Sequence, residues 1–221
     1  MNGVEVRPIS PGALPDRIAR WLAEQFPPHP LRVAVDGAPP ARPDDLADAT
    51  GTALRARGRP VARVSARWFW RQASLRLEYG RRDAVARYER WLDTGALRRE
   101  VLDRLGPGGD RRFLPSLWDP DRDRATRADY RQVEPHTVLL LDGALLLGAD
   151  LPVDAIIHIR LSAGALRRRM PADDAWMLPA FERYDTEVRP ADQADVLVLA
   201  DDPAHPAVRF GPGLSRRPAS R

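Results

Sequence analysis

Polar residues end three short apolar runs of the chain, and these junctions are where the sequence is best suited to do chemistry. The runs at 31–36, 60–65 and 137–143 have the length and composition of buried parallel strands. In an open parallel sheet, ligands bind at the carboxyl ends of the strands. The loops that follow Asp36, Ser65 and Asp142 are therefore the candidate positions for a site.

The first of these loops, GAPPARPD at 37–44, lies where a phosphate-binding loop of pattern G-x-x-x-x-G-K-[ST] would open a helix. Gly37 fills the first position, but Arg42 replaces the second glycine, Pro43 the lysine and Asp44 the hydroxyl residue. Three of the eight residues are proline and lack an N–H donor. A carboxylate about 4 Å from a phosphate is unfavourable by roughly 4 kcal/mol at an effective dielectric near 20. The loop is therefore predicted not to hold a triphosphate.

Composition excludes several classes of mechanism. All 35 basic residues are arginine and there is no cysteine, so Schiff bases, a phosphate-binding lysine, thiolate catalysis and zinc–cysteine sites are excluded. The four histidines show no metal-ligand spacing, and we expect no metal site. His136 and His158 are interpreted as packed or edge residues of strands. A net charge of +4 does not by itself indicate nucleic acid.

Strands and helices are predicted to alternate. Beyond the three runs, we expect strands at 154–160 and 194–200, helices at 13–26, 43–57, 83–92, 95–105, 162–169 and 177–188, and a small hairpin around 112–118. Such alternation is typical of an α/β domain with a mostly parallel sheet covered on both faces. We divide the chain into an N-terminal helix and linker that pack on the core (1–30), one domain (31–200) and a loose tail (201–221).

Several segments together resemble a known family. They are VAVDG at 33–37, RPVARVS at 59–65, GRRD at 80–83, WLD at 91–93, ALRREVLDRLGPGG at 96–109, VLLLDG at 138–143 and EVRPADQADVLV at 187–198. In this order and spacing the chain resembles the uridine kinase family of P-loop nucleoside kinases, especially its actinobacterial-type members. The resemblance implies a three-layer P-loop NTPase fold, ATP and Mg²⁺ as cosubstrates, and phosphoryl transfer to the 5′-hydroxyl of uridine or cytidine.

The resemblance also implies positions for the site. A vestigial site for ATP and Mg²⁺ is expected at Gly37, Arg42, Asp44, Asp142, Arg168 and Arg169, the last two from the lid. Substrate-binding positions are expected at Arg67, Phe69, Arg82 and Asp83. The family's acidic residues after the second strand are absent here, so no catalytic residue is assigned. Without a Mg²⁺-binding hydroxyl, Asp142 is interpreted as a strand-end residue that caps the next turn.

These observations favour a uridine-kinase-like cytoplasmic protein in which ATP-dependent phosphorylation is lost or strongly impaired. It would retain binding of a nucleoside or nucleotide, or act through a protein partner. One alternative is an active nucleoside kinase with a phosphate site rebuilt from Arg42 and the lid arginines. Another is a nucleic-acid or protein-interaction module that uses the aromatic segment 67–71 and the arginine-rich loop. No membrane partner is expected, nucleic acid is not the favoured partner, and the oligomeric state stays open.

Overall fold

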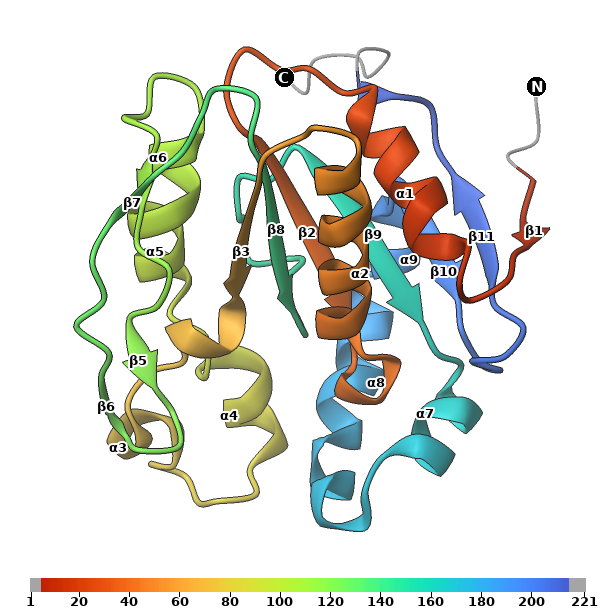
Figure 1. Ribbon diagram of the computed structural model, residues 1–221. Helices are drawn as coiled ribbons and strands as arrows, with labels where there is room; N and C mark the ends of the chain where they lie inside the picture. The colour runs from red at the N-terminus through yellow and green to blue at the C-terminus, as the bar shows by residue number, and fades with distance from the viewer. Residues whose placement is uncertain (1–4, 215–221) are drawn as a thin grey trace.

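The computed structural model describes residues 5–214 and is built on one seven-stranded sheet (Figure 1). The strand order is β1-β11-β10-β9-β2-β8-β3. Its strands are β1 (Arg7–Pro8), β2 (Leu31–Gly37), β3 (Val61–Ser65), β8 (Val138–Gly143), β9 (Ala155–Arg160), β10 (Val196–Leu199) and β11 (Ala207–Phe210). The five strands from β10 to β3 run parallel, and β11 and β1 add an antiparallel edge. The predicted α/β class with a mostly parallel sheet is confirmed.

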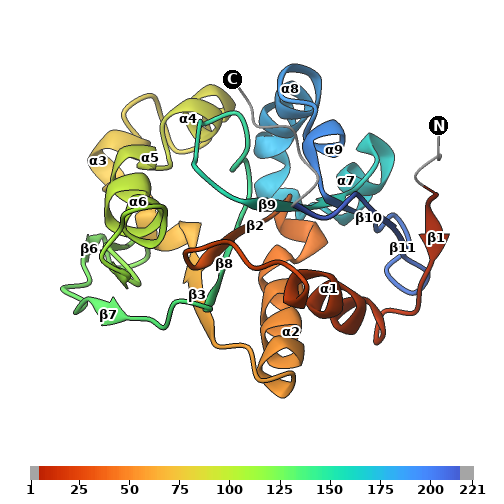
Figure 2. The ribbon, with the colours of Figure 1, turned by 90° about the horizontal axis from the view of Figure 1, so that it is seen from above.

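Helices cover both faces of the sheet (Figure 2). On one face lie α1 (Leu14–Ala23) and α2 (Pro43–Ala56); the other carries α4 (Ala84–Glu89), α5 (Thr94–Leu97), α6 (Asp103–Leu105) and α8 (Leu178–Glu187). Successive strand residues point to opposite faces, so Val33 and Val35 pack in the core under α1 and α2, whereas Ala34 packs in the core on the other face. The remaining helices are α3 (Ala73–Arg76), α7 (Ala163–Arg169) and α9 (Pro190–Gln193).

The predicted helix at 95–105 is one continuous helical run, with a π-helical turn at Arg98–Leu102 between α5 and α6. No helix within residues 5–214 is long and apolar enough to cross a membrane.

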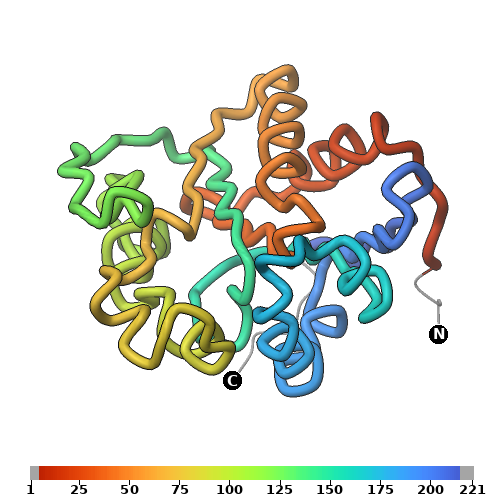
Figure 3. Tube along the Cα trace, turned by 90° about the horizontal axis from the view of Figure 1, so that it is seen from below, coloured from red at the N-terminus to blue at the C-terminus, as the bar shows by residue number. Residues whose placement is uncertain are grey.

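Two predictions about irregular segments are corrected. The hairpin expected around 112–118 does not form; instead β4 (Arg112–Phe113) pairs with β7 (Arg131–Gln132), and β5 (Trp118–Asp119) pairs with β6 (Arg124–Ala125) inside it. These short ladders run beside β3 at the edge of the sheet (Figures 1 and 3). The partners of β4 and β7 are too far apart in sequence for local turn signals to reveal them.

The tail expected at 201–221 is also partly structured. Its residues 207–210 form β11, which pairs with both β10 and β1. Val208 is buried in the core, and its burial stabilises β11. This strand of four residues is too short to be recognised within a proline-rich sequence. Residues 215–221 of the tail lie outside the described part of the chain.

A buried ion pair joins the start of β2 to the segment before β9. Arg32 donates from Nε and its backbone N–H to Asp154 Oδ2, at 3.0 and 2.8 Å, and from Nη2 to Oδ1 at 2.7 Å. Its Nη1 donates to the carbonyl of Leu102 at 3.2 Å. One arginine thus connects the central strand, the crossover to β9 and the helix α5–α6.

Asp154→Ala should lower the free energy of unfolding by about 3–5 kcal/mol, because it leaves the buried Arg32 cation without its carboxylate. Asp16→Ala is the control, since the carboxylate of Asp16 is half-exposed where it pairs with Arg57, and it should cost no more than about 1 kcal/mol. Urea denaturation of the two variants measures the difference. Equal losses of unfolding free energy in the two variants would show that the Arg32–Asp154 pair stabilises the fold no more than an exposed ion pair does.

Candidate functional site

The turn between β2 and α2 uses its own backbone donors. Residues Pro39–Ala41 form a 3₁₀ turn in which Ala41 N–H donates to the carbonyl of Ala38 at 2.8 Å. Arg42 N–H donates to the carbonyl of Pro39 at 3.0 Å. The other three residues from 39 to 43 are proline. Every position in this run therefore either lacks an N–H or donates it inside the turn.

The charges of this turn also compensate one another. Arg42 adopts the left-handed conformation (φ 55°), and its guanidinium lies 2.7 Å from Asp45 Oδ1 and 3.6 Å from Asp44 Oδ1. Both aspartates lie in the first turn of α2, where they interact favourably with the helix dipole. The positive end of α2 is thus covered by carboxylates, and the arginine that would have to bind phosphate is already paired with them.

The carboxylate at the end of β8 is held by an arginine from β3. Asp142 Oδ1 lies 2.8 Å from Arg63 Nη2, and the side chain of Asp142 is 5 % exposed. Arg63 Nε donates to Asp48 Oδ1 at 2.8 Å and Nη1 donates to the carbonyl of Leu140 at 2.9 Å. Burial raises the pKa of Asp142, and the charge of Arg63 partly opposes this. A guanidinium therefore occupies the side of this carboxylate that faces α2.

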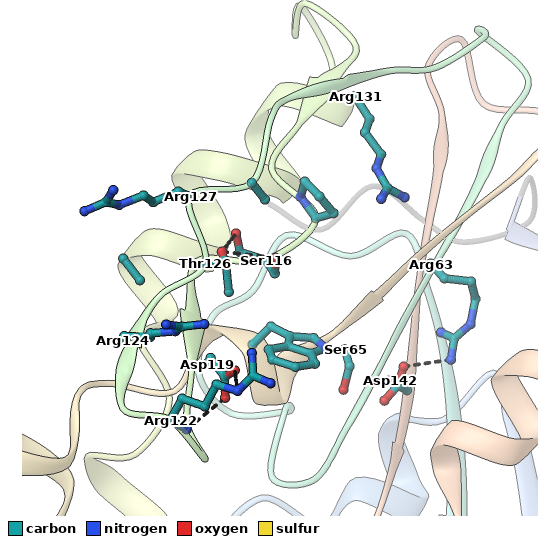
Figure 4. A pocket seen from close by; sticks show the side chains of 14 residues that line it. Arg63, Ser65, Ser116, Asp119, Arg122, Arg124, Thr126, Arg127, Arg131 and Asp142 are labelled. Carbon is teal, nitrogen blue, oxygen red and sulfur yellow. Dashed lines mark hydrogen bonds and ion pairs between the residues drawn. The ribbon is translucent and has the colours of Figure 1, made fainter.

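Next to Asp142 opens a cavity of about 910 Å³, which we call the basic cavity (Figure 4). One wall comes from the ends of β3 and β8, and the other from the segment 115–131. Its charged lining consists of Arg63, Asp119, Arg122, Arg124, Arg127, Arg131 and Asp142. Five cations against two carboxylates leave an excess of three positive charges. Trp68 adds an aromatic surface.

Three of these arginines have no acceptor for their guanidinium groups among the described residues. Arg63 and Arg122 pair with carboxylates, but Arg124, Arg127 and Arg131 make no side-chain hydrogen bond or ion pair. Arg124 and Arg131 point into the space in front of Ser65 and Asp142, whereas Arg127 points away from it (Figure 4). The basic cavity therefore presents unpaired donors of the kind that bind phosphate or carboxylate.

Several residues of the expected site for ATP and Mg²⁺ lie together at the turn between β2 and α2, where they bind one another or the backbone. Gly37 ends β2 against Ile159, and Asp44 and Arg42 pair with each other. Arg169 donates to the carbonyls of Pro40 and Ala200, so the backbone already occupies it. Arg168 is exposed on α7 and makes no ion pair within residues 5–214.

The expected substrate-binding residues Arg67, Phe69, Arg82 and Asp83 do not line the basic cavity. Phe69 is fully buried in the core under α5 and α6. Arg67 pairs with Asp121 and stacks on its aromatic neighbours. Arg82 pairs weakly with Asp173, and Asp83 caps α4 by accepting from Ala86 N–H at 2.7 Å. Arg67 and Phe69 directly follow β3 in sequence, but the 3₁₀ turn at Ala66–Phe69 directs Phe69 inward.

Along the chain the arginines of the basic cavity alternate with aspartates, a pattern that favours a solvated zwitterionic loop. The charge balance of a shorter window does indicate a basic surface, because residues 124–131 contain three arginines and one aspartate. The aromatic segment 67–71 is largely packed, since Trp70 contacts Trp91 edge-on at 5.1 Å between centroids. Of its three aromatic residues, only Trp68 lines the basic cavity, so the segment does not present the continuous stacking surface that nucleic-acid binding would need.

Comparison with solved structures identifies the fold. A possible uridine kinase from Bacillus stearothermophilus has a TM-score of 0.68 at 15% identity, with 83% of this chain and 96% of that chain covered. A proposed fructose transport system kinase from a Silicibacter species has a TM-score of 0.56 at 22% identity, covering 85% and 90%. No protein-family model and no curated protein matches the sequence. At these identities the likeness establishes the P-loop kinase fold and no more.

One contact anchors the loop that carries the cavity arginines. Tyr130 donates its hydroxyl to Glu100 Oε2 at 2.5 Å, and Arg99 donates to Glu100 Oε1 at 2.7 Å. The hydrogen bond from Tyr130 contributes most to lowering the pKa of Glu100, and it outweighs the effect of partial burial. The hydrogen bond from Arg99 and the charges of Arg99 and Arg104 lower this pKa further. Glu100 therefore favours the folded state above its ordinary pKa of 4.5, and this contribution is lost as the pH falls through the lowered value.

We expect Glu100→Gln to be less stable than the wild type at pH 7, and the difference to shrink as the pH is lowered from 4.5 towards 3. Urea denaturation across this range measures it. Asp129→Asn serves as the control, because Asp129 makes no ion pair or side-chain hydrogen bond within residues 5–214, and it should change stability by no more than about 0.5 kcal/mol. A Glu100→Gln difference that stays constant with pH would contradict the anchoring role of the ionised carboxylate.

Proposed function

We propose that this protein is a uridine-kinase-like member of the P-loop kinase fold that binds a nucleotide in the basic cavity and has lost, or nearly lost, ATP-dependent phosphoryl transfer. The observation that carries the proposal is the turn between β2 and α2, in which no residue from 39 to 43 has an N–H left to donate. Phosphoryl transfer depends almost wholly on positioning the phosphates and neutralising their charge. Residues 39–43, which have no free N–H, can do neither through their backbone.

The residues present do not fit ATP and Mg²⁺. A hydroxyl that would bind Mg²⁺ is replaced by Asp44, and the acidic residue at the end of β8 is paired with Arg63. Within residues 5–214 there is no cluster of three side chains able to hold a metal ion. We therefore derive no catalytic step from these groups, and we assign no catalytic residue.

The unpaired charge of the basic cavity supports binding of an anion. Arg124 and Arg131 line a space large enough for a small-molecule ligand, and the indole of Trp68 provides a surface on which a base can stack. A ligand that combines an aromatic base with a phosphate matches both features. A nucleoside monophosphate is therefore the favoured ligand, ahead of an uncharged nucleoside.

The main alternative, an active kinase with a rebuilt phosphate site, requires Arg42 or Arg169 to release its present partners. Arg42 would have to leave Asp44 and Asp45, which would then face the triphosphate themselves. Arg169 would have to give up two backbone carbonyls. These losses weigh against the alternative.

Binding is tested by thermal unfolding with UMP, uridine and ATP·Mg²⁺ in separate titrations. A ligand at a hundred times its Kd adds about 2.7 kcal/mol of stability, which corresponds to a rise of roughly 5–10 °C for a chain of this size. We expect such a rise with UMP, a smaller one with uridine and none with ATP·Mg²⁺. Saturable stabilisation by ATP that depends on Mg²⁺ would contradict the proposal.

Arg124→Ala and Arg131→Ala should each weaken UMP binding about tenfold to a hundredfold, because each removes a charge-assisted hydrogen bond. Arg55→Ala is the matched control, since Arg55 is exposed on α2 outside the cavity. This substitution removes the same charge from the protein. Equal effects of the three substitutions would indicate non-specific attraction. Steep salt-dependent binding of an oligonucleotide in preference to UMP would instead favour a nucleic-acid module.

Catalysis is tested by uridine-dependent and cytidine-dependent formation of ADP. We expect turnover at least a thousandfold below the usual 1–100 s⁻¹ of kinases. Turnover in the usual range that Arg42→Ala abolishes would establish the active-kinase alternative.

A further inference from the structure

A buried polar cluster lies at the end of β2, apart from the basic cavity. Asp36 is fully buried, and its Oδ2 lies 2.8 Å from His158 Nδ1 and accepts from the Tyr184 hydroxyl at 2.9 Å. Its Oδ1 accepts from Leu146 N–H at 3.0 Å. The Tyr184 hydroxyl in turn accepts from Leu147 N–H at 3.0 Å. The buried carboxylate of Asp36 therefore accepts from two donors, Leu146 N–H and the Tyr184 hydroxyl, and His158 Nδ1 is its third partner.

This arrangement determines the tautomer of His158. An ionised carboxylate can only accept hydrogen bonds, so Nδ1 carries the proton that it donates to Asp36. Burial and the charge of Asp36 raise the pKa of Tyr184, so its hydroxyl also stays a donor. In the neutral imidazole Nε2 is then left with a lone pair, and it makes no hydrogen bond within the described residues. A carboxylate–histidine pair of this kind presents an oriented acceptor or base.

The turn after β8 is strained in a way that maintains the cluster. Leu145 has a φ of 62°, in the left-handed region that a leucine rarely adopts. The next two residues, Leu146 and Leu147, are the ones whose N–H groups reach Asp36 and Tyr184. Such strain persists where surrounding contacts enforce it, and it concentrates at functional sites.

His158 lines a separate cavity of about 300 Å³ between the ends of β2 and β9 and the helices α7 and α8. Apolar side chains make up much of its wall, among them Leu145, Leu161, Leu166 and Phe181. The charged groups of its lining cancel, because Arg160 and Arg167 are balanced by Glu182 and Asp185. The cavity thus combines apolar side chains with charged groups that leave no net charge, and it contains an acceptor without a partner among the described residues.

We propose that this cavity is a second ligand site, which binds a small neutral molecule with an apolar body and one O–H or N–H group that it donates to Nε2 of His158. The required acceptor, apolar surface and lack of net charge are all provided by residues that the nucleotide proposal does not use. The two cavities share no lining residue, so a ligand can bind in one whether or not the other binds a nucleotide.

The experiment uses ¹⁵N NMR of the four histidines, with phenol and indole as probes and anisole and 1-methylindole as matched probes without the donor. We expect phenol and indole to shift the His158 Nε2 resonance saturably, and to bind at least tenfold more tightly than their methylated counterparts. His158→Asn identifies the resonance by its disappearance. The asparagine amide can still donate to Asp36 in place of Nδ1 but leaves no acceptor at the position of Nε2, so the preference for the donor probes should disappear in this variant.

Three outcomes would overturn the proposal. The first is that no probe shifts the His158 resonance at millimolar concentration. The second is that the methylated probes bind the wild type as tightly as phenol and indole. The third is that a folded His158→Asn variant keeps the preference for donor probes. If His158→Asn does not fold, the first two comparisons, both made on the wild-type protein, still decide the question.

Discussion

Between β2 and α2, residues 39–43 leave no backbone N–H free for a ligand, and the rest of the candidate site follows from that constraint. Ala41 and Arg42 donate within the turn and prolines occupy the remaining positions from 39 to 43. Backbone donors used in this way are not available to a ligand. The same P-loop kinase fold therefore presents its binding groups elsewhere at this edge of the sheet, in the side chains that surround the ends of β3, β8 and β9.

Arginine takes over the electrostatic roles in this chain because lysine is absent. Arg63 neutralises Asp142 and connects β3 to α2, while Arg32 connects the central strand to the crossover before β9. In both cases the planar guanidinium forms several hydrogen bonds at once, which an ammonium group cannot do with the same geometry. Within the described part of the chain Arg124 and Arg131 have no partner, and this leaves the positive charge of the basic cavity available to a ligand.

The parallel register explains why two different cavities lie so close together. Asp36 on β2 pairs with His158 on β9, and Val35 on the same strand pairs with Asp142 on β8. The polar ends of neighbouring strands are thereby brought to one edge. On the β8 side the edge meets an arginine-rich loop, and on the β9 side it meets the apolar face of α7 and α8. One edge consequently carries a cationic cavity and a neutral one.

The sequence by itself determined the fold class, the order of strands and helices and the failure of the G-x-x-x-x-G-K-[ST] pattern, because apolar periodicity, proline and the absence of lysine are local properties. Only the tertiary structure decided which arginines are free. Arg42 and Arg169 look like phosphate ligands in the sequence but are occupied by Asp45 and by Pro40, whereas Arg124 and Arg131 look like members of a balanced charged loop but have no partners. The pairing of Asp36 with His158, 122 residues apart, and the burial of Phe69 were equally inaccessible. A side chain's charge and size can be read from its type, but its partner depends on which distant segments the sheet brings together.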